Sequence, residues 1–439
     1  MNNDIHFSTY HEATSFLFSQ LPMYQQVGKI AYKADLNTPL QLDKYFDFPH
    51  KKYRTIHVAG TNGKGSTSHM LAAVLQTAGY KVGLYTSPHL KDFRERIKIN
   101  GISISETEVL SFVNKHWQVI EQLQPSFFEM TAALAFDYFA TQKVDVAIIE
   151  TGMGGRLDAT NIISPTLSII TNIGLDHTEH LGDTLSLIAR EKAGIIKPQT
   201  PIVIGEYDAE TAPVFLEIAK KQNASLVFAN QSVQVFPKGM RDFLNYFQIS
   251  YSDAWQEEQL VAVDLLGDYQ QKNIATVFAA LKILQTEIEN PFLISPDVVK
   301  QGLAQTAKLT GLRGRWEIFS REPMTICDIG HNAHGLQNAF AQLRAIPHKQ
   351  LHIVFGIVAD KDLTNILPLM PRDAIYYFTQ ANLPRALAAE CLAEQCRAAG
   401  LQGETIIGVP QAIALAKSRA TKDDVIYIGG SAFVVAEAI

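Results

Sequence analysis

The sequence predicts an α/β protein of two domains: a larger parallel-sheet domain that carries a P-loop, followed by a smaller Rossmann-like α/β domain. Short apolar runs rich in β-branched residues alternate with amphipathic helical patterns, as expected for parallel strands that are buried on both faces. This alternation is interrupted between residues 229 and 315 and then restarts. The chain length of 439 residues allows two or three domains of ordinary size.

The first domain is predicted to alternate strands and helices. Its strands are expected at Thr55–Ala59, Val82–Thr86, Asp145–Thr151, Leu167–Asn172 and Ile202–Gly205. Helices are expected between them at Ser66–Ala78, Glu106–Gln122, Glu129–Thr141 and Leu185–Ala193. The aromatic and polar stretch Ala229–Val263 predicts short antiparallel strands or an insertion, and helices follow at Tyr269–Leu284 and Asp297–Thr306.

A glycine-rich segment, Lys308–Arg315, has no apolar period and is interpreted as an interdomain linker or a functional loop. We therefore expect the domains to span residues 1–307 and 308–439. Strands of the second domain are predicted at Met324–Asp328, Leu351–Ile357, Ala374–Phe378 and Val425–Ile428. Its helices are predicted at Gly335–Arg344, Asp362–Met370, Arg385–Ala399, Pro410–Lys417 and Ser431–Ala438.

Composition excludes several classes of protein. The net charge of −6 disfavours a general nucleic-acid binder, and 47% hydrophobic residues disfavour disorder. The 3 cysteines do not suggest a disulfide scaffold. No apolar run is long enough to span a membrane, and the first residues lack the basic and apolar regions of a signal peptide. We expect a cytoplasmic monomer that binds neither nucleic acid nor membrane.

The strongest chemical signal is the run AGTNGKGST, residues 59–67, which follows a predicted strand and opens a predicted helix. Its glycines allow the backbone to approach phosphates, and the helix N-terminus adds positive potential. Lys64 would neutralise phosphate charge, and Ser66 offers a hydroxyl to Mg²⁺. The spacing differs from the usual P-loop because Gly65 separates Lys64 from Ser66, and a glycine-rich turn without a ligand is the alternative.

Two further residues follow strands of the same predicted sheet. Glu150 ends the apolar run VDVAIIE, and His177 comes shortly after the next strand. The carboxyl ends of parallel strands share one edge of a sheet, so both side chains are expected near the P-loop. Either residue taken alone has a structural explanation, and Mg²⁺ ordinarily prefers oxygen ligands to imidazole.

Seven motifs occur along the chain in one order: GTNGKGS at 60–66, SPHL at 87–90, ETGMGGRLDATN at 150–161, LDH at 175–177, EKAGIIK at 191–197, GDYQ at 267–270 and DIGHN at 328–332. In this order the sequence resembles the bifunctional dihydrofolate synthase/folylpolyglutamate synthases of the Mur ligase superfamily. The resemblance covers nearly the whole chain. GTNGKGS alone indicates only the superfamily, whereas SPHL together with GGRLDATN is far more specific.

The resemblance implies roles for individual residues. ATP is expected to contact Gly63, Lys64, Gly65, Ser66, Asn273, Arg315, Asp328 and His331. Two Mg²⁺ ions are expected, with Ser87, Glu150, His177 and Lys192 as ligands, and Lys64, Lys192 and His177 are the expected catalytic residues. Lys192 matches a lysine that the family carbamylates, which turns a cation into an anionic ligand. Without the resemblance, a solvated helix lysine is the better interpretation.

Dihydropteroate is expected to contact Phe128, Leu157, Asp158 and Ala159, with Phe128 as a stacking face and Asp158 as a hydrogen-bond acceptor. The implied reaction is ATP-dependent ligation of L-glutamate to dihydropteroate and to folates through an acyl phosphate. Alternatives are a folylpolyglutamate synthase only, a Mur-type amino-acid ligase, and a nucleotide switch. About 59 residues precede Gly60, too few for the nucleotide-sugar domain of a Mur ligase, and the guanine-reading motif of a switch is missing.

Overall fold

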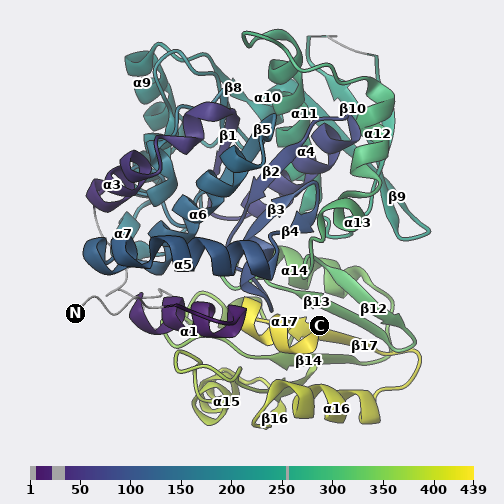
Figure 1. Ribbon diagram of the computed structural model, residues 1–439. Coiled ribbons are helices and arrows are strands. Elements are labelled where there is room, and N and C mark those ends of the chain that lie inside the picture. Colours follow the sequence, from purple (N-terminus) through teal and green to yellow (C-terminus); the bar gives the residue numbers. More distant parts are fainter. Residues whose placement is uncertain (1–5, 22–34, 254–256) are drawn as a thin grey trace. The chain divides into compact units, whose positions relative to one another are not determined.

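The computed structural model describes residues 6–21, 35–253 and 257–439. Contacts between residues divide the chain into two compact units (Figure 1). Unit 1 comprises Met1–Arg241, Asn245–Asp264 and Gln271–Gly311, and unit 2 comprises Asp242–Leu244, Leu265–Gln270 and Leu312–Ile439. Two short segments on the amino-terminal side of Gly311 therefore pack with the second unit.

An eight-stranded sheet forms the centre of unit 1, with the strand order β4-β3-β2-β5-β1-β6-β7-β8. Neighbours from β2 to β8 are parallel, and the pairs β2–β3 and β3–β4 are antiparallel. The strands are β1 Arg54–Ala59, β2 Val82–Tyr85, β3 Ile97–Ile99, β4 Ile102–Ser103, β5 Val146–Glu150, β6 Leu167–Ile170, β7 Ile202–Ile204 and β8 Leu226–Phe228. The predicted parallel α/β architecture is confirmed.

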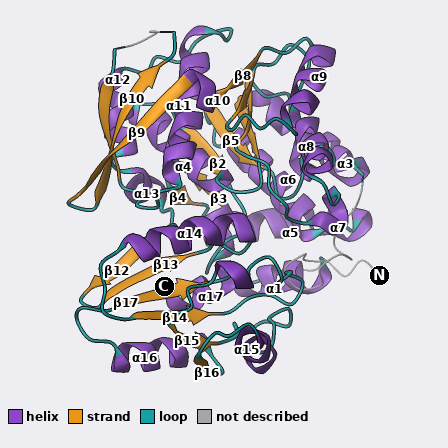
Figure 2. Cartoon of the chain, turned by 180° about the vertical axis from the view of Figure 1, so that it is seen from behind, coloured by secondary structure: helices purple, strands orange, loops and turns teal. Residues whose placement is uncertain are grey.

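Helices cover both faces of this sheet (Figure 2). The described helices from residue 6 to residue 310 are α1 Tyr10–Gln20, α3 Asn37–Tyr45, α4 Lys64–Thr77, α5 Glu106–Leu123, α6 Phe127–Thr141, α7 Thr178–Leu181, α8 Leu185–Lys192, α9 Ala212–Gln222, α10 Ala229–Ser232, α11 Gln270–Thr286, α12 Pro296–Leu303 and α13 Thr306–Thr310. A separate sheet has the order β11-β10-β9, with β9 Val233–Arg241, β10 Leu244–Tyr251 and β11 Gln259–Val263. It confirms the strands predicted within Ala229–Val263.

The alternation of side chains along β5 explains why its first four residues are apolar. Ala147 and Ile149 belong to the core cluster that includes α6 and α5. Successive side chains of a strand point to opposite faces, so Val146 and Ile148 face the other side, where α4 contacts β5. All four residues are fully buried. Burial on both faces therefore explains the four apolar positions, and the strand ends at Glu150.

Unit 2 contains a six-stranded sheet of order β12-β13-β17-β14-β15-β16, in which only the β12–β13 pair is antiparallel. Its strands are β12 Glu317–Arg321, β13 Met324–Asp328, β14 Leu351–Phe355, β15 Ile375–Phe378, β16 Gly403–Thr405 and β17 Val425–Gly429. Its helices are α14 Ala333–Ala345, α15 Ala389–Ala398, α16 Val409–Arg419 and α17 Ala432–Ala438. Each unit has its own apolar core.

The structure corrects two of the predicted elements. Asp362–Met370 is not a helix, and only the short 3₁₀ turn η6, Leu367–Leu369, forms there. The Asp362 carboxylate instead accepts the backbone N–H of Thr364, and Pro368 lacks the N–H that a helix interior requires. The segment 308–315, which was expected to be a loop, is helical up to Thr310, the last residue of α13. Gly311 follows as the C-cap residue and has the left-handed conformation.

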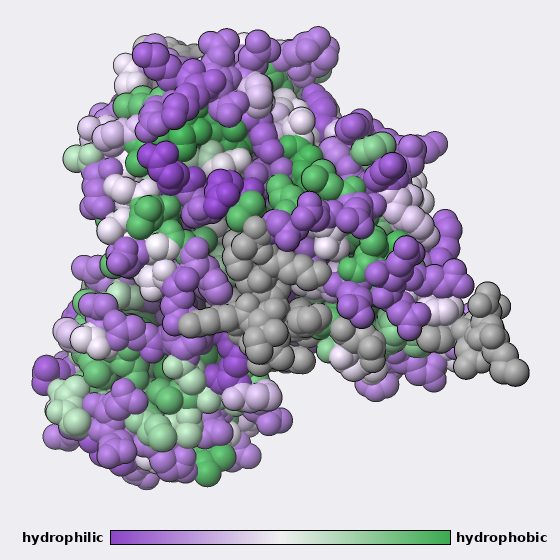
Figure 3. Space-filling view, turned by 90° about the vertical axis from the view of Figure 1, so that its left-hand side faces the viewer, coloured by the Kyte–Doolittle hydropathy of each residue, from purple (hydrophilic) through white to green (hydrophobic). Residues whose placement is uncertain are grey.

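Sequence reasoning also missed the elements α1, α3, α7, α9, α10, β3, β4, β8, β12 and β16. Among the residues that the structure describes, no helix is long and apolar enough to cross a bilayer. On the face shown in Figure 3, hydrophilic residues are interspersed with hydrophobic ones.

Candidate functional site

The P-loop connects β1 to α4 in unit 1. Gly63 is the N-cap residue of α4 and has a φ of 81°, a left-handed conformation that favours glycine. The helix begins at Lys64, and Gly65 and Ser66 lie in its first turn. Backbone N–H groups at this helix terminus have no partner within the helix, so they form an anion site of the kind that binds phosphates.

Two lysines meet at one carbonyl of this loop. Lys64 Nζ donates to the Gly60 carbonyl oxygen at 3.0 Å, and Lys192 Nζ donates to the same oxygen at 2.9 Å. Lys192 lies at the end of α8 and is only 4% exposed. Burial, and then the charge of Lys64, lower the pKa of Lys192 to about 7. A large fraction of Lys192 is therefore a neutral amine at neutral pH.

Side chains that follow β6, together with one from α11, contact the loop. Thr171 Oγ1 donates to the Asn62 carbonyl at 2.6 Å, and the Asn172 side chain accepts the backbone N–H of Asn62 at 2.9 Å. A Cβ added to Gly63 would lie 2.2 Å from Oδ1 of Asn273, so this asparagine packs directly on the loop. The structure thus brings Asn273 to the P-loop. Thr171 and Asn172 were missed because their contacts are with backbone atoms far away in the sequence.

Three of the four expected metal ligands, Ser87, Glu150 and His177, lie at or after the ends of strands β2, β5 and β6. Glu150 is 3% exposed at the end of β5, and its Oε2 accepts the backbone N–H of Ser87 at 3.3 Å. His177 is the residue before α7, with a φ of 50°, and its Nε2 lies 4.0 Å from Oδ2 of Asp176. In the described part of the chain, no three His, Cys, Asp or Glu side chains are arranged to hold a metal ion.

The expected pterin residues are held by hydrogen bonds and close packing. Asp158 is 4% exposed. Its Oδ2 accepts the N–H groups of Gly152 and Met153, and its Oδ1 accepts the N–H and hydroxyl of Thr160. A Cβ added to Gly152 would lie 2.6 Å from Cζ of Phe128, so the backbone at Gly152 packs against this half-buried ring. Leu157 is half-buried and Ala159 is buried.

The GGRLDATN loop is also fastened to the segment that carries Lys192. The backbone N–H of Arg156 donates to the Glu191 carbonyl at 2.7 Å, and the Asn161 amide donates to the Gly194 carbonyl at 3.0 Å. A Cβ added to Gly155 would lie 2.7 Å from the carbonyl oxygen of Lys192. The loop that carries Asp158 therefore packs directly against the segment that carries Lys192.

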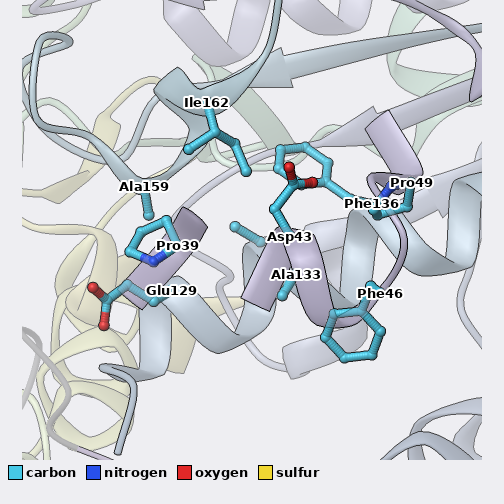
Figure 4. A pocket seen from close by; sticks show the side chains of 10 residues that line it. Pro39, Asp43, Phe46, Pro49, Glu129, Ala133, Phe136, Ala159 and Ile162 are labelled. Carbon is cyan, nitrogen blue, oxygen red and sulfur yellow. The ribbon is translucent and has the colours of Figure 1, made fainter. Parts of the chain in front are cut away.

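A pocket lies between α3, α6 and the 3₁₀ turn η4, Ala159–Ile162 (Figure 4). Both acidic residues that line the pocket already have protein partners. Asp43 Oδ1 lies 2.7 Å from His50 Nδ1, and the Glu129 carboxylate accepts the backbone N–H of Ser126, the N-cap residue of α6. The pocket is bordered by Ala159, one of the expected pterin residues.

The remaining expected ATP contacts belong to unit 2. Asp328 ends β13 and is 3% exposed. Its Oδ2 accepts the Tyr269 hydroxyl at 2.6 Å and the Trp316 N–H at 2.9 Å. Burial raises the pKa of Asp328, and these hydrogen bonds and the charge of Arg315 counteract that effect. Nδ1 of His331 lies 3.1 Å from the Ile329 carbonyl oxygen, at the same strand end.

Comparison with known proteins agrees with this geometry. The family model of the Mur ligase middle domain matches residues 58–281, and that of the Mur ligase glutamate ligase domain matches residues 314–432. The dihydrofolate synthase/folylpolyglutamate synthase of Bacillus subtilis is 33% identical over 444 residues, covering 98% of each chain.

Two solved structures are similar along almost the whole chain. Escherichia coli FolC in complex with DHPP and ADP has a TM-score of 0.83 and 28% identity, and the match covers 98% of this chain and 97% of that one. The bifunctional enzyme of Yersinia pestis with AMPPNP and Mn has a TM-score of 0.84, 28% identity and the same coverage. The chain belongs to the dihydrofolate synthase/folylpolyglutamate synthase family of the Mur ligase superfamily.

Proposed function

We propose that this protein is an ATP-dependent carboxylate–amine ligase that joins L-glutamate to dihydropteroate, forming dihydrofolate, and to folates, forming polyglutamates. The observation that carries the proposal is the meeting of Lys64 and Lys192 at the Gly60 carbonyl of the P-loop. This arrangement occurs in a chain that matches a Bacillus subtilis enzyme of that name end to end. Both SPHL and GGRLDATN are retained, which favours dihydropteroate as a substrate.

In the proposed site, Gly63, Lys64, Gly65 and Ser66 bind the ATP phosphates, and Asn273 contacts the nucleotide from α11. The packing of Asn273 on Gly63 supports this assignment. From unit 2, Arg315, Asp328 and His331 contribute further contacts to ATP.

A divalent metal ion accompanies ATP in this family, and we propose Mg²⁺ held by Ser87, Glu150 and His177. The donor set fits a divalent cation because a buried carboxylate at the end of β5 lies beside a serine that follows the neighbouring strand β2. Bound there, Mg²⁺ would neutralise charge that develops on the transferring phosphoryl group.

We further propose that Lys192 is carbamylated and serves as a ligand of a second Mg²⁺. Carbamylation requires a neutral amine, whose lone pair attacks CO₂ and forms an N–C bond while a proton is released. An ordinary lysine is almost entirely protonated at pH 7, whereas the pKa of Lys192 is about 7 because of burial and the charge of Lys64. The resulting anion would also face the Lys64 cation rather than another ammonium group.

The acceptor substrate is proposed to bind beside Phe128, Leu157 and Ala159, with its pterin stacked on the Phe128 ring. The Asp158 carboxylate accepts backbone N–H groups of the loop beside these residues and so holds its conformation. The pocket beside Ala159 lies next to this site.

The reaction activates a carboxylate that would otherwise resist attack by an amine. The substrate carboxylate attacks the γ-phosphorus of ATP, so a P–O bond to ADP breaks and an acyl phosphate forms. The α-amine of glutamate then attacks the acyl carbon, and the tetrahedral intermediate expels phosphate and loses a proton to give the amide. Lys64 stabilises the phosphoryl oxygens, and the protein needs no nucleophile of its own. A cytoplasmic location and a monomeric state remain predictions.

A substrate omission series tests the proposal. Purified protein receives MgATP, L-glutamate and dihydropteroate, each left out in turn, and phosphate release is measured. The proposal expects phosphate release only when all three substrates are present. Phosphate release that does not depend on glutamate, or on dihydropteroate, would contradict the proposal. Tetrahydrofolate in place of dihydropteroate distinguishes two activities from one, and a protein active only with tetrahydrofolate would be a folylpolyglutamate synthase alone.

A further inference from the structure

The connection between β6 and α7 pairs with the P-loop and then reaches an expected metal ligand. It begins at Thr171 and Asn172, whose side chains hold the backbone of Asn62. The backbone N–H of Thr61 also donates to the Asn172 carbonyl oxygen at 3.0 Å. The same connection ends at His177, the residue before α7. One short stretch of chain therefore contacts the phosphate-binding loop at its start and carries a metal ligand at its end.

The Thr61 hydroxyl extends this pairing to the middle of the connection. Its Oγ1 donates to the Gly174 carbonyl oxygen at 3.1 Å and accepts the Gly174 backbone N–H at 3.0 Å. One hydroxyl can make both hydrogen bonds because it has a single proton and two lone pairs. Gly174 is buried, and an unpaired backbone group costs free energy in the interior of a protein. The Thr61 hydroxyl therefore stabilises the backbone conformation at Gly174.

The backbone of His177 has a conformation that neighbouring contacts must impose. Its φ of 50° lies in the left-handed region, which residues with a side chain seldom adopt. Such a conformation persists only where the surrounding structure holds it. The helix α7 that follows has only 4 residues, so it fixes the backbone on one side alone. On the other side of His177, Gly174 is the point at which the connection is held to the P-loop.

The contacts of Asn62 are separate from those of the Thr61 hydroxyl. Thr171 Oγ1 donates to the Asn62 carbonyl at 2.6 Å, and the Asn172 side chain accepts the Asn62 N–H at 2.9 Å. Neither bond involves the Thr61 side chain. Loss of the Thr61 hydroxyl would therefore release Gly174 while these contacts continue to hold the P-loop.

Resting on the proposed function, we infer that Thr61 is a positioning residue, whose hydroxyl sets His177 relative to the phosphate-binding loop. A metal ion that accompanies a nucleotide is bound partly by phosphate oxygens, so its protein ligands must be placed relative to the loop that holds the phosphates. The Thr61 hydroxyl does this through Gly174. Groups that orient a metal ligand in this way contribute strongly to metal affinity.

Calorimetry of the Thr61→Val variant tests the inference. Each protein is titrated with AMPPNP in the absence of metal and then with AMPPNP in excess Mn²⁺. The ratio of the two affinities measures the gain due to the metal ion. We expect Thr61→Val to lower this gain by about tenfold or more, because the support of a metal ligand is lost. Affinity for metal-free AMPPNP should stay within about twofold of the wild type, since the contacts of Asn62 remain.

Two further variants control for the substitution itself. Thr61→Ser retains the hydroxyl and should restore the wild-type gain. Thr77→Val is the matched control, because Thr77 is half-buried like Thr61 and its hydroxyl donates to the Ala73 carbonyl of its own helix, α4. This variant should leave both affinities unchanged. If Thr61→Val does not fold, Thr61→Ala, which also lacks the hydroxyl, decides.

A comparison with His177→Ala separates the inference from the proposed metal site. His177→Ala should lower the gain, and adding Thr61→Val to it should lower the gain no further, because Thr61 acts through His177. An unchanged gain in Thr61→Val beside a lowered gain in His177→Ala would overturn the inference, and so would an equal loss of affinity for metal-free AMPPNP. An unchanged gain in His177→Ala would instead refute the proposed metal site, and the inference with it.

Discussion

Replacing Lys192 with methionine removes an ammonium group that the fold buries, and we expect this to stabilise the protein at neutral pH. Burial, with the charge of Lys64 adding to it, lowers the pKa of Lys192 from 10.5 to about 7. A lowering of this size corresponds to about 5 kcal/mol of unfavourable free energy in the native state while the amine is protonated. Loss of the hydrogen bond to Gly60 offsets about 1 kcal/mol. We expect a net stabilisation of about 4 kcal/mol.

The pH dependence gives this prediction its sign. Below pH 7, Lys192 is protonated in both the native and the unfolded state, so the full difference between variant and wild type is present. Between pH 7 and 10.5 the native amine is neutral while the unfolded chain still binds a proton. The free energy of unfolding of the wild type therefore rises by up to about 1.4 kcal/mol per pH unit relative to the variant.

Urea denaturation of both proteins in CO₂-free buffer at pH 6.5, 8 and 9.5 measures this difference. We expect the variant to be more stable at pH 6.5 and the two proteins to converge toward pH 9.5. A variant that is less stable at pH 6.5, or a difference that does not change with pH, would refute the claim that Lys192 is buried as an unfavourable cation.

Three further predictions concern the ligands of the site. With ¹³C-labelled bicarbonate, the wild type should show a carbamate carbon resonance that Lys192→Arg lacks, and Lys192→Arg should lose turnover; an active variant would contradict carbamylation. Gly63→Ala places a Cβ 2.2 Å from Oδ1 of Asn273 at a φ of 81°, and calorimetry should find ATP affinity about tenfold weaker. Glu150→Gln should raise the Mg²⁺ concentration for half-maximal activity by about tenfold or more; an unchanged Mg²⁺ requirement would remove Glu150 from the metal site.

The parallel sheets and the P-loop were predictable because their signals are local. β1 is a short, largely buried strand that leads into a glycine-rich turn, and α4 begins directly after that turn. The helix predicted at Asp362–Met370 failed for an equally local reason, since Pro368 and the side chain of Asp362 favour irregular backbone. Apolar spacing alone suggested a helix where these two residues prevent it.

The parts of the site that were missed depend on contacts between distant segments. Thr171 and Asn172 brace the P-loop through the backbone of Asn62, more than a hundred residues earlier in the chain. Thr61 lies within the glycine-rich turn, and only the fold shows that its hydroxyl reaches Gly174. Lys192 resembles a solvated helix residue in sequence, and its perturbed pKa follows from burial beside Lys64. None of these relations leaves a periodic signal along the chain.

The central claim is that ATP phosphorylates the substrate carboxylate before glutamate attacks. Dihydropteroate labelled with ¹⁸O in both carboxylate oxygens tests it directly, because the oxygen that bridges to phosphorus leaves with the phosphate. Mass spectrometry of the phosphate released with MgATP and L-glutamate should find one ¹⁸O atom for each amide formed. Phosphate without ¹⁸O, accompanied by dihydrofolate formation, would contradict an acyl phosphate intermediate.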